Sequence, residues 1–71
     1  MTKQTAHDIS KLMLSLGADL DKSVGRVKEA ESEAEFRRYR EAVSKIMATM
    51  LLEIMNPLYA EHPNLKPAQI Q

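Results

Sequence analysis

The stretch RRYR at positions 37–40 has the clearest potential for chemistry, because three guanidinium groups flank one phenol ring. Arginines beside an aromatic residue are typical of surfaces that hold phosphates and stack on nucleic-acid bases. Successive residues of a helix are about 100° apart, so Arg37, Arg38 and Arg40 would point in three directions rather than form one patch. Glutamates one turn before Arg37 and Arg38 favour local ion pairs instead. A solvated, salt-bridged helix face is therefore the leading interpretation.

The same region also provides candidates for the recognition of a protein partner. Arg40 borders the apolar side of its helix, where its stem can cover hydrophobic neighbours while the guanidinium reaches a carboxylate. Tyr59 lies in a proline-rich segment that can dock as an extended motif. We therefore assign possible partner recognition to Arg37, Arg38, Arg40 and Tyr59.

Metal-binding and catalytic constellations are absent from the sequence. The two histidines, His7 and His62, each lie beside one carboxylate. Adjacent helical residues diverge by about 100°, so neither pair can converge on one ion unaided. There is no cysteine to supply thiolate ligands, no nucleophile elbow and no glycine-rich phosphate loop. We therefore expect no metal, no cofactor and no enzymatic activity.

Size and charge restrict the function further. The chain has 71 residues, with ten basic and ten acidic side chains. A chain of this length buries only about 60% of its unfolded surface, so we expect it to need a partner for stability. Zero net charge removes the global positive field expected of a protein that binds nucleic acid or anionic membrane. No apolar run approaches the ~20 residues of a membrane span, and we expect a cytoplasmic protein.

The residues from Ile9 to Val27 have the periodicity of one amphipathic helix. Their apolar side chains recur in steps of three and four positions, which is helical spacing rather than the alternation of a strand. Thr5 is the expected N-cap, which gives a first helix over about 6–28. Two glycines lie within it, and an earlier end at Gly25 through a left-handed cap remains an alternative.

A second apolar stripe runs from Phe36 to Leu58 with the same spacing and predicts a helix over about 33–55. On one continuous helix the two stripes would centre near ~185° and ~0°, on opposite sides. A turn over about 29–32 lets them face each other instead. Ser32, followed three residues later by a glutamate, fits a capping box for the second helix. The sequence therefore predicts an all-α, antiparallel helical hairpin rather than one rod.

The end of the chain is rich in proline. Asn56-Pro57 is expected to end or kink the second helix, because proline lacks an N–H and disfavours helix at the residue before it. After the proline we expect a short helical turn over 57–61 and then a loose tail over 62–71. Leu58 and Tyr59 are expected to pack back across the open end of the hairpin.

Two packed helices contact each other along one line of side chains, the seam, but they enclose no interior. The apolar residues of the second helix spread over roughly 180° after Ile46, which one neighbour cannot cover. We therefore expect self-association, most simply as a dimer that forms a four-helix bundle, with a trimer, a tetramer or a groove on another protein as alternatives. The predicted oligomer interface consists of Phe36, Val43, Ile46, Met47, Met50, Leu51, Ile54, Met55 and Leu58.

These expectations favour a small non-enzymatic module for protein–protein interaction and oligomerisation, with a partner protein that the sequence does not identify. A dimeric nucleic-acid-binding regulator is one alternative, because dimerisation could gather two copies of the basic residues on one face. A carrier of an apolar small ligand is another, since five methionines provide a soft surface that adapts to varied shapes.

Overall fold

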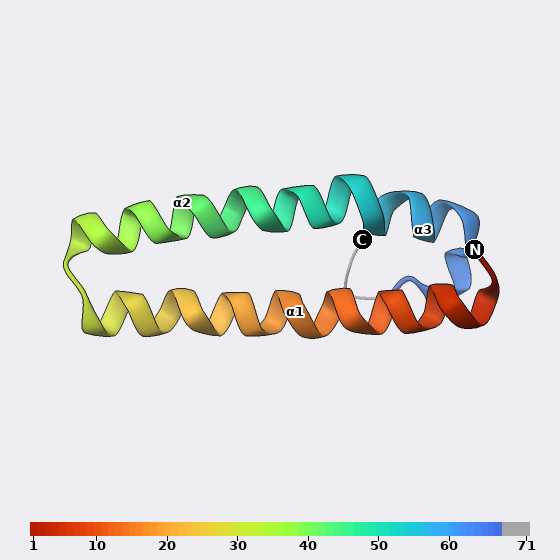
Figure 1. The fold of residues 1–71 in the computed structure, drawn as a ribbon, viewed down its shortest axis with the longest axis horizontal. Coiled ribbons are helices and arrows are strands. Elements are labelled where there is room, and N and C mark those ends of the chain that lie inside the picture. Colours follow the sequence, from red (N-terminus) through yellow and green to blue (C-terminus); the bar gives the residue numbers. More distant parts are fainter. Residues whose placement is uncertain (68–71) are drawn as a thin grey trace.

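The described residues, 1–67, form an antiparallel pair of helices in the computed structural model of the chain (Figure 1). Helix α1 spans Lys3–Ala30 and helix α2 spans Glu33–Thr49. The chain then continues through a π-helical segment η1, a short helix α3 and a 3-10 turn η2, which span Met50–Met55, Asn56–Glu61 and Pro63–Leu65. The predicted all-α hairpin is thereby confirmed, and this part of the chain contains no strand. The predicted loose tail includes residues 68–71, which lie outside the described residues.

Helix α1 begins one turn earlier than predicted, because Thr2 rather than Thr5 is its N-cap. Thr2 has an extended backbone, with φ −67° and ψ 162°, and its Oγ1 accepts a hydrogen bond of 3.2 Å from the Thr5 N–H. Lys3 and Gln4 are good helix formers and extend the helix back to this cap. The start predicted at about residue 6 is therefore corrected to Lys3.

A short connection at Glu31 and Ser32 reverses the chain between α1 and α2. Ser32 has an extended backbone, and its Oγ accepts a hydrogen bond of 3.2 Å from the Glu35 N–H. Glu33 and Glu35 lie in the first turn of α2, where their negative charge favours the positive end of the helix dipole. The N-cap predicted at Ser32 is thus confirmed, while α1 runs to Ala30, two residues beyond its predicted end.

Neither glycine interrupts α1. No glycine in residues 1–67 has a positive φ, so no left-handed cap ends the helix at Gly25. A Cβ atom added at Gly25 would meet nothing within 4 Å, whereas one added at Gly17 would lie 3.8 Å from Met47 Cε. Gly17 therefore lies against the second helix, and Gly25 lies in open space.

The second helix widens into η1 just before Pro57. In a regular α-helix, this proline would lack the bond to residue 53 and its ring would clash with the Glu53 carbonyl. The Asn56 N–H instead donates to the Leu51 carbonyl, five residues earlier, in the wide π pattern. The chain then continues as α3. The predicted helix over 33–55 and turn over 57–61 are therefore corrected to one helical run with a π segment inside it.

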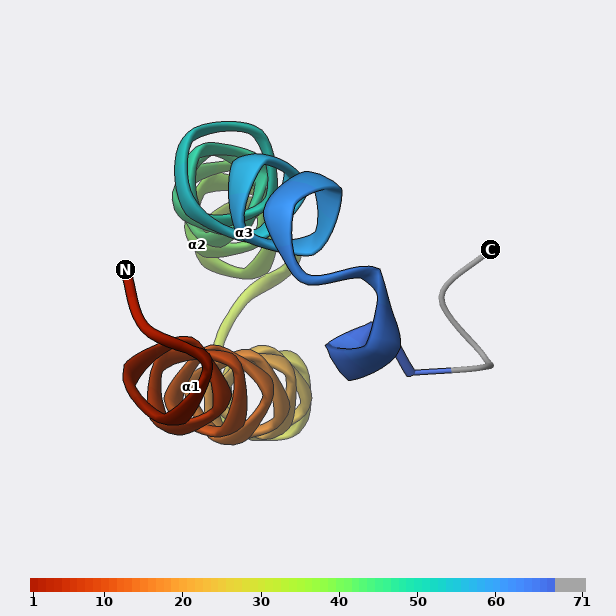
Figure 2. The same cartoon turned by 90° about the vertical axis from the view of Figure 1, so that its right-hand side faces the viewer.

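A buried hydrophobic cluster lies at the open end of the hairpin. It consists of Ala6, Met13, Met55, Leu58 and Tyr59. Leu65 of η2 packs against this cluster, because the turn at η2 carries the chain back toward α1 (Figure 2). The predicted packing of Leu58 and Tyr59 across the open end is confirmed, whereas the prediction of a loose chain from residue 62 is corrected over Pro63–Leu65.

The hairpin is long and narrow, with extents of 44 × 20 × 16 Å. Figure 2 looks along the helices and shows α1 opposite α2 and α3, with η2 to one side of the plane that contains them. Among residues 1–67, no helix combines the length and the apolar character needed to cross a bilayer.

Candidate interaction surfaces

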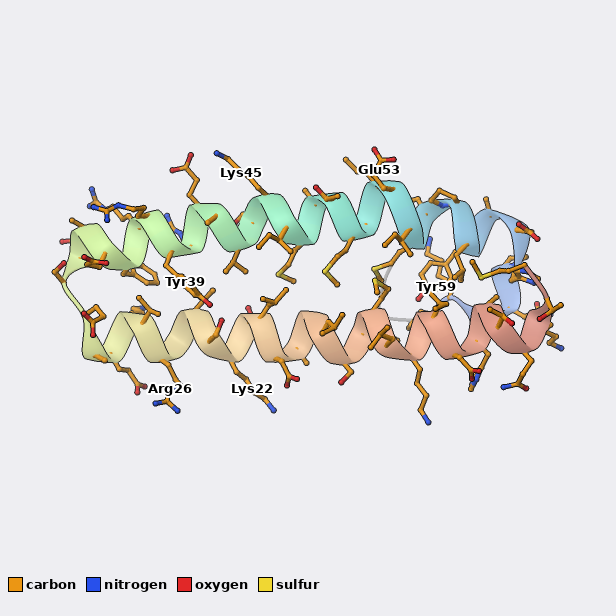
Figure 3. All side chains as sticks on the ribbon, viewed as in Figure 1. Lys22, Arg26, Tyr39, Lys45, Glu53 and Tyr59 are labelled. Atoms are coloured by element: carbon orange, nitrogen blue, oxygen red, sulfur yellow. The ribbon has the colours of Figure 1, made fainter. Side chains whose placement is uncertain are left out.

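Two serine–tyrosine hydrogen bonds join the two arms of the hairpin at different levels (Figure 3). Near the open end, the hydroxyls of Ser10 and Tyr59 share a hydrogen bond of 2.6 Å, and both residues are buried. Nearer the turn, Ser23 donates its single hydroxyl proton to the Leu20 carbonyl at 2.6 Å, so it accepts from the Tyr39 hydroxyl at 2.7 Å. These bonds fix the rotation of the arms and hence determine which side chains face outward.

The position of Tyr59 depends on η1. Val43 is buried at the seam between the arms, and sixteen α-helical residues later Tyr59 would be rotated by about 160° from it, away from α1. A π-helical turn rotates less per residue, because its hydrogen bonds close over five residues instead of four. The rotation lost in η1 brings Tyr59 back to the seam, where it points toward α1 (Figure 3) and is only 6% exposed.

Tyr59 was assigned to partner recognition from the sequence, and the structure places it in an internal contact instead. Its ring belongs to the buried cluster, and its hydroxyl is bonded to Ser10. A partner cannot reach this side chain in the described conformation. The proline-rich segment around it is part of the fold over Asn56–Glu61 and Pro63–Leu65 rather than an extended motif.

The predicted oligomer interface divides into three groups by exposure. The residues buried within the single chain are Val43, Met55 and Leu58. The half-buried residues are Phe36, Met47 and Met50. The residues left exposed are Ile46, Leu51 and Ile54. Only the exposed group, with the outer parts of the half-buried one, offers surface to a partner.

A groove runs along one flank of the hairpin between α1 and the α2–η1 arm, with a volume of about 340 Å³. Leu14 and Ala18 line it from α1, and Leu51 lines it from η1. The remaining lining is dominated by four methionines, Met13, Met47, Met50 and Met55. This methionine groove is apolar and adaptable, because the thioether side chain is flexible and polarisable.

The opposite flank carries exposed aliphatic side chains. Leu12 and Leu16 are four residues apart and therefore share one side of α1. That side is about 160° away from Leu14 and Ala18, which line the methionine groove. Leu12 and Leu16 are 48% and 41% exposed, so this flank presents apolar surface that the chain itself does not cover.

The second arm contributes two isoleucines to the same flank. Ile46 and Met47 lie on either side of buried Val43 around the helix axis, and Met47 faces the groove, so Ile46 faces away from it. Ile54 follows Ile46 by about two turns, and it borders a different depression, beside Pro57. We call the exposed set on this flank the aliphatic strip; it consists of Leu12, Leu16, Ile46 and Ile54.

Leu12 and Leu16 were not among the predicted interface residues, because the whole apolar arc of the first helix was assigned to the seam. The residues of α1 that are buried are Ala6, Ser10 and Met13. Their burial shows that α1 contacts the second arm along a line to one side of its apolar arc. Leu12 and Leu16, on the other side of the arc, are left exposed to solvent. Alanine and serine carry little hydrophobic signal, so the sequence alone did not reveal this rotation.

The three arginines of the RRYR stretch do not converge on one site. Arg37 forms an exposed ion pair of 2.7 Å with Glu33, as predicted from their spacing, and Arg38 is exposed. The guanidinium of Arg40 and the ammonium of Lys28 lie over the Phe36 ring, 5.3 and 5.8 Å from its centroid. Arg40 therefore covers apolar surface, as expected, but through a cation–π contact of its guanidinium; the predicted reach to a carboxylate is not among the ion pairs of residues 1–67.

The two histidines lie at separate places near the open end. His7 is 3.6 Å from the Asp8 carboxylate and exposed. The His62 Nε2 atom is 3.1 Å from the Met1 carbonyl oxygen and 3.4 Å from the Glu61 carboxylate. Within residues 1–67 no group of three or more histidine and carboxylate side chains is placed to hold a metal ion.

The described residues thus define a small all-helical hairpin with a methionine groove on one flank and an aliphatic strip on the other. Comparison of the chain with known protein families, with curated proteins and with solved structures finds no match. The proposals below therefore start from these two surfaces.

Proposed function

We propose that this chain is a self-associating helical hairpin that serves as a protein–protein interaction module rather than as an enzyme. The observation that carries the proposal is the thin core. Within the described residues no large side chain is fully buried, and eight large hydrophobic residues are 38% or more exposed. Large exposed apolar surface is typical of an interaction site.

The total surface supports the same conclusion. The chain exposes 5430 Å² for a mass of 8.0 kDa, about 1,000 Å² more than the roughly 4,450 Å² expected for a compact monomer of that mass. A stable protein–protein interface buries about 800 Å² on each partner. The excess exposed surface is therefore about as large as the area that a standard interface buries on each chain.

Charge does not oppose association between identical copies. The formal net charge is zero, so two chains approach without the mutual repulsion of strongly charged proteins. Charged residues such as Lys22, Arg26, Lys45 and Glu53 point away from the seam on the outer sides of the two arms (Figure 3). They keep the assembled hairpins hydrated without lying between the arms.

Sedimentation equilibrium over a range of chain concentrations tests the proposal. We expect at least twice the 8.0 kDa chain mass at micromolar concentration, with dissociation on dilution. Circular dichroism at the same concentrations would show whether helix is lost as the assembly dissociates. A folded species of single-chain mass throughout would contradict the proposal.

The methionine groove favours a second function, the binding of an apolar small ligand. Its volume of about 340 Å³ lies at the lower end of the ~300–1,000 Å³ range of small-molecule pockets. Methionine side chains can reshape around ligands of different outline. A hydrocarbon or aromatic compound of modest size fits this lining better than a polar metabolite.

Two glycine variants test the ligand site with a matched control. Leucine at position 17 would fill the groove, because a Cβ atom there already lies 3.8 Å from Met47 Cε, whereas leucine at position 25 would enter open space. We expect Gly17→Leu to abolish saturable binding of an apolar fluorescent probe and Gly25→Leu to preserve it. Equal binding by both variants would exclude the groove as the ligand site.

A further inference from the structure

We propose that the second copy of the chain docks on the aliphatic strip, and that the methionine groove stays outside the dimer interface. This inference rests on the proposed self-association and specifies its surface and symmetry. In a two-fold dimer the strip of one copy would pack against the same strip of the other. The result is a four-helix bundle in which each chain contributes one flank of its hairpin.

The composition of the two flanks distinguishes them. On the strip, both arms present branched aliphatic side chains, and Leu16 and Ile46 are 41% and 50% exposed. On the groove flank, Leu14 and Ala18 line a depression of about 340 Å³, whereas Ile54 of the strip borders a smaller one of about 200 Å³. Projecting aliphatic side chains can interdigitate with those of a second copy, whereas two facing grooves would leave a void between the copies.

The path of the chain after α3 points to the same flank. Lys3, His7, Leu14 and Ala18 are spaced by four and seven residues and therefore follow one side of α1. Leu65 borders the same depression as Lys3 and His7, so η2 lies on the groove flank. Figure 2 shows this segment to one side of the two arms. The described chain thus partly occupies the groove flank through η2. On the strip flank, Met1 borders the depression beside Ile54, while Leu12, Leu16 and Ile46 remain 41–50% exposed for a second copy.

The share of exposed apolar side chains also favours the strip. Among residues 1–67, the strip includes four of the eight large hydrophobic residues that are 38% or more exposed, whereas two of them, Leu14 and Leu51, line the methionine groove. A stable dimer interface buries about 800 Å² on each copy, and the flank with more exposed apolar side chains gains more from that burial. The strip therefore offers the larger apolar surface to a second copy.

Two pairs of variants, one on each arm, test which flank forms the dimer. Leu16→Glu and Leu14→Glu introduce the same charge on the same helix at sites of 41% and 39% exposure, but on opposite flanks. We expect Leu16→Glu to raise the dimer dissociation constant by roughly 100-fold or more, because an unpaired charge is costly in an apolar interface. Leu14→Glu should leave it within about threefold. Ile46→Glu and Leu51→Glu form the corresponding pair on the other arm, at sites of 50% and 38% exposure, because Leu51 lines the groove; the expectation is the same.

Each result of the sedimentation experiment has a distinct meaning. A dimer that is lost with Leu16→Glu and Ile46→Glu and retained with Leu14→Glu supports the strip. A dimer that is lost only with Leu14→Glu overturns the inference but keeps the proposed self-association. A wild-type chain that stays monomeric overturns both.

A distance measurement keeps the inference testable if a charged variant fails to fold. The chain contains no cysteine, so Asp19→Cys and Ala18→Cys can each carry one spin label at the edge of one flank. In a dimer formed through the strip, the labels at 19 should be closer across the two copies than those at 18, by on the order of one helix diameter, about 10 Å. The reverse order of distances would place the interface on the groove flank and overturn the inference.

Discussion

The buried hydrogen bond between Ser10 and Tyr59 offers the sharpest test of how the arms of the hairpin are held together. The perturbation is a double-mutant cycle of Ser10→Ala, Tyr59→Phe and the two combined. Each change removes one hydroxyl and little else, so the cycle isolates the contribution of the hydrogen bond. Both residues are buried, at 5% and 6% exposure, and their hydroxyls are 2.6 Å apart.

The expected magnitudes follow from this burial. Either single change leaves the other hydroxyl buried without its partner, which costs about 1–3 kcal/mol of unfolding free energy. The double variant removes both polar groups at once and should lose less than the sum of the singles. We therefore expect a coupling energy of about 1 kcal/mol or more between Ser10 and Tyr59.

The second bridge, between Ser23 and Tyr39, is a matched control within the same protein. It is only partly buried, and Ser23 keeps its bond to the Leu20 carbonyl when the tyrosine hydroxyl is removed. Water can also reach the remaining hydroxyl, so the cost of each single change should fall below about 1 kcal/mol. The coupling of this pair should be the smaller of the two.

Urea unfolding followed by circular dichroism gives the required free energies. All variants must be compared at one chain concentration, because association of folded chains adds concentration-dependent stability. Sedimentation of each variant would show that its assembly is unchanged. A coupling energy near zero for Ser10 and Tyr59, or one no larger than that of Ser23 and Tyr39, would refute the claim that the buried bridge fixes the arms.

Three further predictions use the same unfolding measurement. Ser32→Ala should lower the unfolding free energy by about 1 kcal/mol, because it removes the cap on the Glu35 N–H; no change would mean that the turn does not depend on this bond. Arg37→Ala should change it by less than about 0.5 kcal/mol, since the pair with Glu33 is exposed, and a larger loss would contradict a solvated helix face. Gly25→Ala should raise it by roughly 0.5–1 kcal/mol, because the site is helical and open; destabilisation would show that the position needs glycine.

The hairpin was predictable because the signals that specify it are local. The apolar stripes before and after the turn are out of phase, which requires a reversal of the chain if each stripe is to cover the other. Ser32 provided the cap at the start of the second helix, and the structure has that bond. The start of α1 was missed because two threonines could serve as the cap, and the good helix formers between them extend the helix to the earlier one.

The π segment could not be predicted from the periodicity of apolar residues. Pro57 showed that the regular helix must change near this point, but it could equally have ended the helix or kinked it. Widening the helix keeps the chain helical and rotates Tyr59 onto Ser10. Ser10 and Tyr59 are 49 residues apart in sequence, so no local sequence pattern could predict their contact.

The sequence by itself determined that this chain is helical, where it reverses and that its apolar residues exceed what two helices can bury. These three features follow from the types and spacing of residues that lie within one or two helical turns of each other. Only the tertiary structure decided which apolar residues lie inside and which outside. Burial of Ala6 and Ser10 rotates the seam away from Leu12 and Leu16, and η1 moves Tyr59 from the surface to the core. The physical reason is that close packing and a buried hydrogen bond select one rotation of each helix, whereas hydrophobic periodicity specifies only a broad apolar arc.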